Sequence, residues 1–134
     1  LKGMVLIAPA PDFTEKLMWP EFDEAAKKEI MEDGVHLRPS DYGDPYPITR
    51  ALIEDGKTWS ILDGPIVFDG PVRILQGMED ADVPWQHAER LVLAMTTSDL
   101  VFQLIKDGDH RLSRPQDIAR LKETCAEISL AIQA

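Results

Sequence analysis

PVRILQGMEDADVP at residues 71–84 decides the fold, because an apolar run is followed there by an acidic turn. LVFQLIKDGDH at 100–110 has the same form, and the residues at 84–95 have the apolar spacing of an amphipathic helix. Short apolar runs bounded by turn residues are typical of buried strands, and two such strands joined by a helix favour a parallel pair. The turns after parallel strands meet at the sheet edge where ligands bind. The sequence therefore predicts a site at this edge, with Asp80 and His110 as its polar groups.

The preceding part of the chain predicts one more strand and a helical insertion. The apolar run MVLIA at 4–8 is typical of a strand that is buried on both faces. Asp12 and Glu15 have capping-box spacing and predict a short helix, while residues 35–47 form either a loop or a short hairpin. The order of strand, helical insertion, strand, helix, strand and helix predicts an α/β fold with an inserted subdomain.

The chain ends in the pattern of a long helix, expected over 114–132. Ser113 and Gln116 have capping-box spacing, and Pro115 falls in the first turn, where proline is tolerated. The single cysteine, Cys125, is expected on the packed face of this helix. One cysteine cannot form an internal disulfide, so nothing indicates a secreted protein, and a cytoplasmic location is the simplest expectation.

Composition restricts the classes of partner. The chain has 134 residues, 44% hydrophobic and 28% charged, which is ordinary for a soluble globular domain. Its formal net charge of −10 argues against nucleic-acid and anionic-membrane partners, which require basic patches. No apolar run is long enough to predict a membrane span. The simplest interpretation of the charge is a solvated acidic surface.

The motifs resemble those of the α/β-hydrolase family. G-x-x-D-x-x-V-P at 77–84 is followed by G-x-H at 108–110. The chain is similar to the small α/β-hydrolases around abhydrolase domain-containing protein 10 and its bacterial relatives. This similarity rests on LIAPAPDF (6–13), YPITRALIEDG (46–56), PVRILQGMEDADVPW (71–85) and DGDHRLS (107–113). Gln76 departs from the pattern, since many relatives have His there, and this is expected to affect substrate fit rather than chemistry.

The resemblance implies the C-terminal part of an α/β-hydrolase fold, with a mostly parallel sheet in three α/β/α layers and a helical lid. It places a core strand in 1–10, the lid in 11–62 and the closing β-α-β-α in 63–134. Leu1 stands almost directly before a strand pattern, so the chain is expected to be truncated upstream. Its fold would then need the N-terminal half.

The resemblance also implies a chemistry: hydrolysis of carboxylic esters or thioesters, palmitoyl-thioesters included, without a cofactor. Asp80 would be the acid and His110 the base of a Ser-His-Asp triad, in the chain order of the family. The nucleophile is expected upstream of Leu1, because no two of the eight glycines have the spacing of a G-x-S-x-G elbow. A eukaryotic member could be mitochondrial.

Several alternatives stay open at the level of sequence. Asp82 is a rival for the role of the acid. His36 and His87 are expected at the surface, with His87 pointing away from the strand ends. No set of residues has convincing metal-ligand spacing, so no metal site is expected.

Two interpretations of the apolar residues in the insertion stay open. Leu17, Met18, Trp19 and Phe22 either pack onto the body of the protein or form the inner wall of an acyl pocket under a lid. Trp59 and Trp85 are weaker candidates for that wall. Two other functional classes also remain: a catalytically silent binding module, and a serine peptidase of the prolyl-oligopeptidase type.

Overall fold

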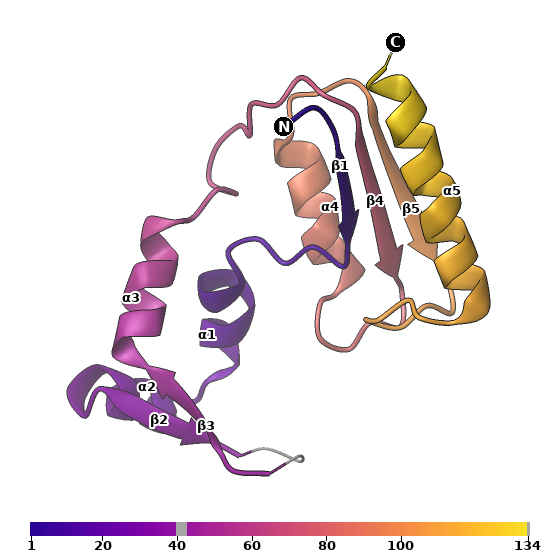
Figure 1. Cartoon of the computed structure of the whole chain (residues 1–134). Helices are drawn as coiled ribbons and strands as arrows, with labels where there is room; N and C mark the ends of the chain where they lie inside the picture. The colour runs from indigo at the N-terminus through magenta and orange to yellow at the C-terminus, as the bar shows by residue number, and fades with distance from the viewer. Residues whose placement is uncertain (40–42, 134) are drawn as a thin grey trace. The chain divides into compact units, whose positions relative to one another are not determined.

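The computed structural model describes residues 1–39 and 43–133, and the chain divides into two compact units (Figure 1). Unit 1 consists of Leu1–Pro11 and Leu62–Ala134, and unit 2 of Asp12–Ile61. The boundaries at 11/12 and 61/62 stand beside the expected ones at 10/11 and 62/63. Each unit has its own core and is described by itself.

Unit 1 is a parallel sheet with a helix on each face. Its strands are β1 (Met4–Ile7), β4 (Val72–Gly77) and β5 (Leu100–Ile105), in the order β1-β4-β5. Helix α4 (Trp85–Ala94) follows β4, and α5 (Pro115–Ala131) follows β5 (Figure 1). The arrangement confirms the predicted α/β class and its parallel strand pair joined by a helix.

Strand β4 is the centre of this unit because all its residues are buried. Side chains alternate between the faces of a strand, so Ile74 and Leu75 point in opposite directions. Ile74 packs in a cluster with Leu91 of α4, whereas Leu75 packs with Leu112 and Leu121 next to and within α5. The two helices therefore cover opposite faces of the sheet.

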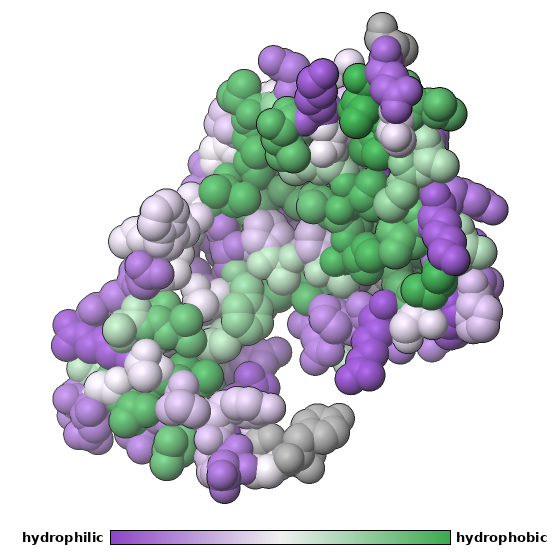
Figure 2. All heavy atoms as spheres, viewed as in Figure 1, coloured by the Kyte–Doolittle hydropathy of each residue, from purple (hydrophilic) through white to green (hydrophobic). Residues whose placement is uncertain are grey.

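Strand β1 differs from the prediction. Residues 4–7 are extended as expected, but the strand is half-buried rather than buried on both faces, and Ile7 is 40% exposed. The reason is its place at the edge of the sheet, where β4 is its single neighbour among the described residues. Hydrophobic side chains also remain exposed elsewhere on unit 1, such as Val67 and Leu93, and Figure 2 shows hydrophobic residues gathered over this part of the visible face.

Helix α5 is capped differently from the prediction. Arg114, not Ser113, is the N-cap residue, and its backbone amide donates to Asp117 in the first turn, while Pro115 occupies the first position as expected. The buried face contains Asp117, Thr124 and Ile128. Cys125 is exposed, so the expectation of a packed thiol is wrong. The apolar spacing predicted the wrong packed face because two polar residues, Asp117 and Thr124, also lie on it.

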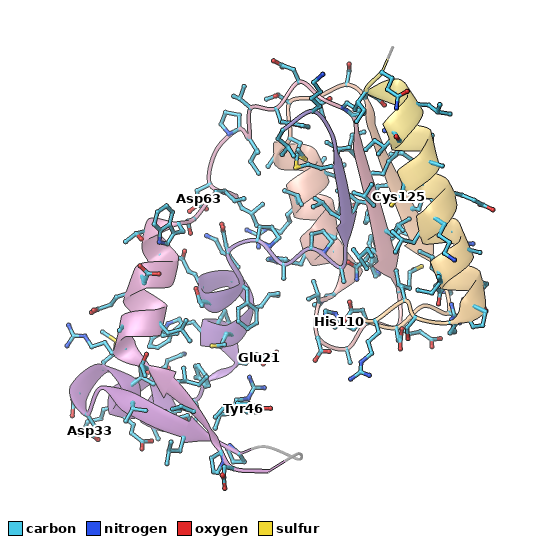
Figure 3. All side chains as sticks on the ribbon, viewed as in Figure 1. Glu21, Asp33, Tyr46, Asp63, His110 and Cys125 are labelled. Atoms are coloured by element: carbon cyan, nitrogen blue, oxygen red, sulfur yellow. The ribbon has the colours of Figure 1, made fainter. Side chains whose placement is uncertain are left out.

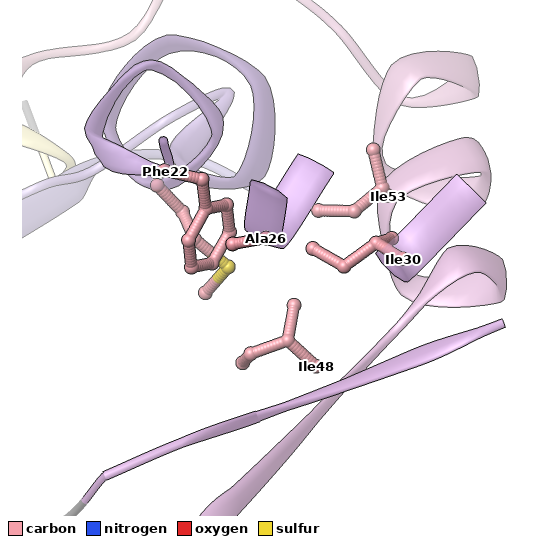
Figure 4. Packing of buried hydrophobic residues seen from close by; sticks show 6 residues of the cluster. Phe22, Ala26, Ile30, Ile48 and Ile53 are labelled. Atoms are coloured by element: carbon pink, nitrogen blue, oxygen red, sulfur yellow. The ribbon is translucent and has the colours of Figure 1, made fainter. Parts of the chain in front are cut away.

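Unit 2 is a small α+β body with a hairpin. Its described residues, 12–39 and 43–61, form a π-helix, η1, then three α-helices, with an antiparallel β2–β3 pair before the last helix. In chain order the elements are η1 (Thr14–Met18), α1 (Trp19–Glu21), α2 (Glu24–Glu32), β2 (Val35–Arg38), β3 (Tyr46–Thr49) and α3 (Arg50–Thr58). The core gathers apolar side chains from five of the six elements or their ends (Figure 4): Met18, Phe22, Ala26, Ile30, Ile48 and Ile53.

The ends of unit 2 are joined by two side chains that had been expected to cap a helix. The Asp12 carboxylate accepts from the backbone amide of Ile61 at 2.8 Å, and Glu15 accepts from the hydroxyl of Ser60 at 2.8 Å. The N-cap residue of η1 is Phe13, without a side-chain cap bond, and these contacts of Asp12 and Glu15 hold the entry and exit of unit 2 together. Within the described ranges 1–39 and 43–133, no helix has the length and apolar character of a membrane span.

We expect Gly56→Ala to destabilise unit 2. Alanine has a higher helix propensity than glycine by about 1 kcal/mol, which alone would stabilise α3. However, a Cβ at Gly56 would overlap the hydroxyl of Thr14, and such overpacking costs about 1–3 kcal/mol. Chemical denaturation should show a net loss, while the control Gly64→Ala, where a Cβ meets open space, should change little. A gain of about 1 kcal/mol for Gly56→Ala would contradict the packing argument.

Candidate active site

The predicted site is built where β4 and β5 end. Gly77 pairs with Ile105 in the parallel register, so strands β4 and β5 end at the same edge of the sheet. The following turns are bonded to each other: the amide of Met78 donates to the carbonyl of Ile105 at 2.9 Å, and that of Glu79 to the carbonyl of Gly108 at 2.9 Å. Residues 78–80 and 108–110 are therefore held side by side.

Gly77 permits this close approach. A Cβ at this position would overlap the carbonyl oxygen of Gly108 and lie 2.5 Å from that of Asp109, both of which are backbone atoms. No side-chain rotation could relieve the overlap. The glycine of the G-x-x-D motif is thus required by the contact between the two turns.

Asp80 and His110 meet across these turns. Nδ1 of His110 lies 2.9 Å from Oδ2 of Asp80. The Asp80 side chain is completely buried, whereas that of His110 is 44% exposed and lies at the strand-end edge of unit 1 (Figure 3). An ionised carboxylate only accepts hydrogen bonds, so Nδ1 must donate, and Nε2 is left as the basic nitrogen of the neutral ring.

The buried carboxylate of Asp80 is held by three further donors. Oδ1 accepts from the amides of Val83 and Asp82 at 2.8 and 2.9 Å, and Oδ2 accepts from Nε2 of Gln76 at 3.0 Å. Burial by itself raises the pKa of this carboxyl, but the hydrogen bonds from Val83, His110, Asp82 and Gln76 outweigh burial and lower it. Asp80 is therefore ionised at neutral pH.

Gln76 belongs to this site, which sequence reasoning missed. Its side chain is fully buried, and Nε2 donates to Asp80 and also lies 3.1 Å from the carbonyls of Gly77 and Val83. Rotating the amide would place its oxygen against three acceptors, so the orientation is fixed. Oε1 is buried without a partner among the described residues. The expectation that position 76 affects only substrate fit overlooked its contact with the acid, which no spacing rule reveals.

Asp82 takes a different position from Asp80. Its side chain is exposed, and its backbone amide serves the carboxylate of Asp80. One ligand atom from each of Asp80, Asp82 and His110 lies within 4.8 Å of the others, a set that could in principle approach a cation. Two of those groups are already hydrogen-bonded to each other, which accounts for the cluster without a metal ion.

Of the two remaining histidines, His87 is placed differently from the prediction. His87 is buried, not at the surface, and its Nε2 lies 2.7 Å from the carbonyl of Pro11, which follows β1. It thus joins the start of α4 to the carboxyl end of β1, so the expectation that it points away from the strand ends is wrong. His36 is half-buried in unit 2, with Nδ1 2.8 Å from Glu29.

The proposed acyl-wall residues have mixed exposure. Met18 and Phe22 are buried in the core of unit 2, while Leu17 and Trp19 are half-buried there. Trp85 is half-buried at the start of α4 in unit 1, and Trp59 is 73% exposed. Packing onto a protein body therefore accounts for Met18 and Phe22, and an acyl wall stays a prediction.

Comparison with known proteins gives no matching family model. The chain is similar to "Palmitoyl-protein thioesterase ABHD10, mitochondrial" from Bos taurus, with 34% identity over 104 residues, 76% of this chain and 34% of that protein. The Homo sapiens protein of the same name is 31% identical over 104 residues, with the same shares covered. The chain therefore spans about a third of the length of these curated relatives.

Solved structures of α/β hydrolases are also similar to this chain. A "putative hydrolase" from Agrobacterium vitis S4 superposes with a TM-score of 0.88 at 48% identity, over 95% of this chain and 49% of that one. Alpha/beta hydrolase domain-containing protein 10 from mouse superposes with a TM-score of 0.80 at 29% identity, over 95% of this chain and 51% of that one. The chain thus has part of an α/β-hydrolase fold and spans about half of each of these structures.

We expect Gln76→Leu to raise the pKa of the Asp80 carboxyl, because the substitution removes a donor to the ionised form and keeps the burial. The carboxyl resonance of Asp80 in a carbon NMR titration measures this directly. Gln103→Leu, a half-buried position on β5, is the matched control. An Asp80 titration that is the same in Gln76→Leu and in the parent protein would contradict the assignment.

The same pKa shift gives a pH dependence of stability. Because the pKa of Asp80 is lowered in the folded state, its ionised form stabilises the fold above the pKa of the unfolded chain, and this contribution is lost as the pH falls through the folded-state pKa. Denaturation at a series of acidic pH values should show a smaller loss of stability for Asp80→Asn than for the parent protein. Equal losses would argue that Asp80 is not the ionised, hydrogen-bonded group described above.

Proposed function

We propose that this chain, which belongs to the α/β hydrolases as a relative of palmitoyl-protein thioesterase ABHD10, supplies the acid and the base of a Ser-His-Asp hydrolase. The observation that carries the proposal is the 2.9 Å contact between a buried carboxylate, Asp80, and a half-exposed imidazole, His110. A base must be reached by the reacting hydroxyl, and its orienting acid must be shielded from water. The exposure of the two groups fits these roles.

The proposed reaction uses His110 twice. Nε2 takes the proton of a serine hydroxyl as its oxygen attacks the acyl carbonyl, and then gives that proton to the leaving alcohol or thiol as the acyl bond breaks. A water molecule then attacks the acyl-serine carbonyl while Nε2 takes its proton, and Nε2 returns that proton to the serine oxygen as the acyl–serine bond breaks and the carboxylic acid product leaves. Asp80 keeps Nδ1 protonated and stabilises the imidazolium. We place the serine outside this chain, whose glycines form no G-x-S-x-G elbow.

The proposed substrates are carboxylic esters or thioesters with an acyl chain. The support for this proposal is that the relatives are named palmitoyl-protein thioesterase. Unit 2, with Leu17, Met18, Trp19 and Phe22, is the proposed lid, and Trp85 is a proposed part of the substrate wall. The name of these relatives also says mitochondrial, which supports that location as the alternative to the cytoplasm.

A second candidate is a catalytically silent α/β-hydrolase module that binds a partner. The observation in its favour is that the sequence itself contains an acid and a base but no nucleophile elbow. In that case the Asp80–His110 pair would be retained as a structural contact. The two candidates differ in whether the protein at its full natural length reacts with a serine-directed probe.

We expect the protein at its full natural length to be labelled by a fluorophosphonate probe, and His110→Ala to abolish the labelling. Removing the base of such a triad costs roughly a millionfold in turnover, as in the serine protease where it has been measured. The control is His36→Ala, which removes a histidine paired with Glu29 in unit 2. Absence of labelling in the parent protein would reject the serine hydrolase and favour the silent module.

A further inference from the structure

Arg114 joins the His110 turn to helix α5 with all of its side-chain donors. Towards the turn, Nη1 donates to the carboxylate and carbonyl oxygens of Asp107 at 2.7 and 2.9 Å, and Nη2 donates to the carboxylate at 3.2 Å. Towards the helix, Nε and Nη2 donate to the two carboxylate oxygens of Asp117 at 2.6 and 3.0 Å. A guanidinium has five N–H donors, and these five bonds use them.

The arrangement closes the loop on which His110 lies. Asp107, two residues after the end of β5, begins the segment 107–114, and Arg114 ends it at the start of α5. The anchor of the bridge is Asp117, whose side chain is only 1% exposed. An ion pair with a buried, bidentate partner has far less freedom than one between exposed side chains. The ends of the loop are therefore fixed relative to each other and to α5.

Two further contacts fix the inside of the loop. The amide of Leu112 donates to the carboxylate of Asp109 at 2.9 Å, and Leu112 itself is buried against Leu75 and Ile105 with a φ of 43°. A positive φ at a leucine is unfavourable and persists only where the surroundings impose it. His110 thus lies between Asp109, whose carboxylate is hydrogen-bonded, and Leu112, which is buried and restricted in its backbone conformation.

We propose that Arg114 is a positioning residue for His110, acting through the bridge from Asp107 to Asp117. Without the bridge, the loop could widen and the imidazole could move relative to the Asp80 carboxylate, whose own position is fixed by buried donors. A small displacement of a reacting group is enough to lower turnover strongly. The inference rests on the proposed hydrolase for its kinetic test but not for its spectroscopic test.

The competing explanation is that Arg114 only stabilises the first turn of α5. The substitution Asp107→Asn distinguishes this explanation from a positioning role. This substitution weakens the bridge on the side of the turn and leaves the bonds between Arg114 and Asp117 intact. Asp107→Glu keeps the carboxylate and serves as the conservative rescue. Arg120→Gln is the matched control, because Arg120 approaches the same Asp117 at 3.8 Å but belongs to the helix.

The kinetic test uses the protein at its full natural length and a chromogenic acyl ester. Asp107→Asn and Arg114→Gln should lower kcat roughly ten- to a hundredfold with KM changed less than about twofold, and Asp107→Glu should recover most of the loss. Arg120→Gln should resemble the parent. A kcat for Asp107→Asn equal to that of Arg120→Gln, or a loss confined to KM, would overturn the proposal.

The spectroscopic test distinguishes this failure from a failure of the proposed function. If the parent protein hydrolyses no ester, the Nδ1–H resonance of His110 in proton–nitrogen NMR still reports its bond to Asp80. That resonance should broaden or disappear in Asp107→Asn, and persist in Asp107→Glu and Arg120→Gln, with amide spectra showing the variants to be folded. An unchanged resonance in Asp107→Asn would overturn the positioning role on its own.

Discussion

The structure depends on keeping one charge, that of Asp80, in a place from which water is excluded. An ionised carboxylate is costly to bury unless its oxygens accept enough hydrogen bonds. Here two backbone amides, one side-chain amide and one imidazole supply them. The donors come from the residues just before and just after Asp80 and from the next strand's turn. The hydrogen bonds to the Asp80 carboxylate therefore hold both turns in place, and the imidazole of His110 donates one of them.

The sheet makes this arrangement possible. The register that pairs Gly77 with Ile105 brings the two turns out together, and the missing side chain of Gly77 lets the backbone at 108–109 come into contact. The buried side chains of β4 then hold the strand between α4 and α5. Position and chemistry are thus linked: the strand pair that forms the core also fixes the distance between the acid and the base.

Much of this could be predicted from sequence. The apolar runs at 71–76 and 100–105 predicted the parallel pair β4–β5, and the positions of Asp80 and His110 after them predicted the candidate pair. The features that could not be predicted depend on tertiary contacts. Gln76 is a polar residue within a strand, and only the folded turn shows that it donates to Asp80. His87 has the spacing of an exposed helical residue, yet the carbonyl of Pro11 accounts for its burial. Asp12 and Glu15 look like a cap, but partners across unit 2 bind them instead.

The bond to Asp80 fixes the proton of His110 on Nδ1 and leaves Nε2 free to act as a base. The most direct measurement is the pattern of long-range proton–nitrogen couplings of the His110 ring at a pH where it is neutral, in the parent protein and in Asp80→Asn. We expect a protonated Nδ1 in the parent protein and a loss of that preference in Asp80→Asn. A neutral ring protonated on Nε2, or the same pattern in both proteins, would contradict it.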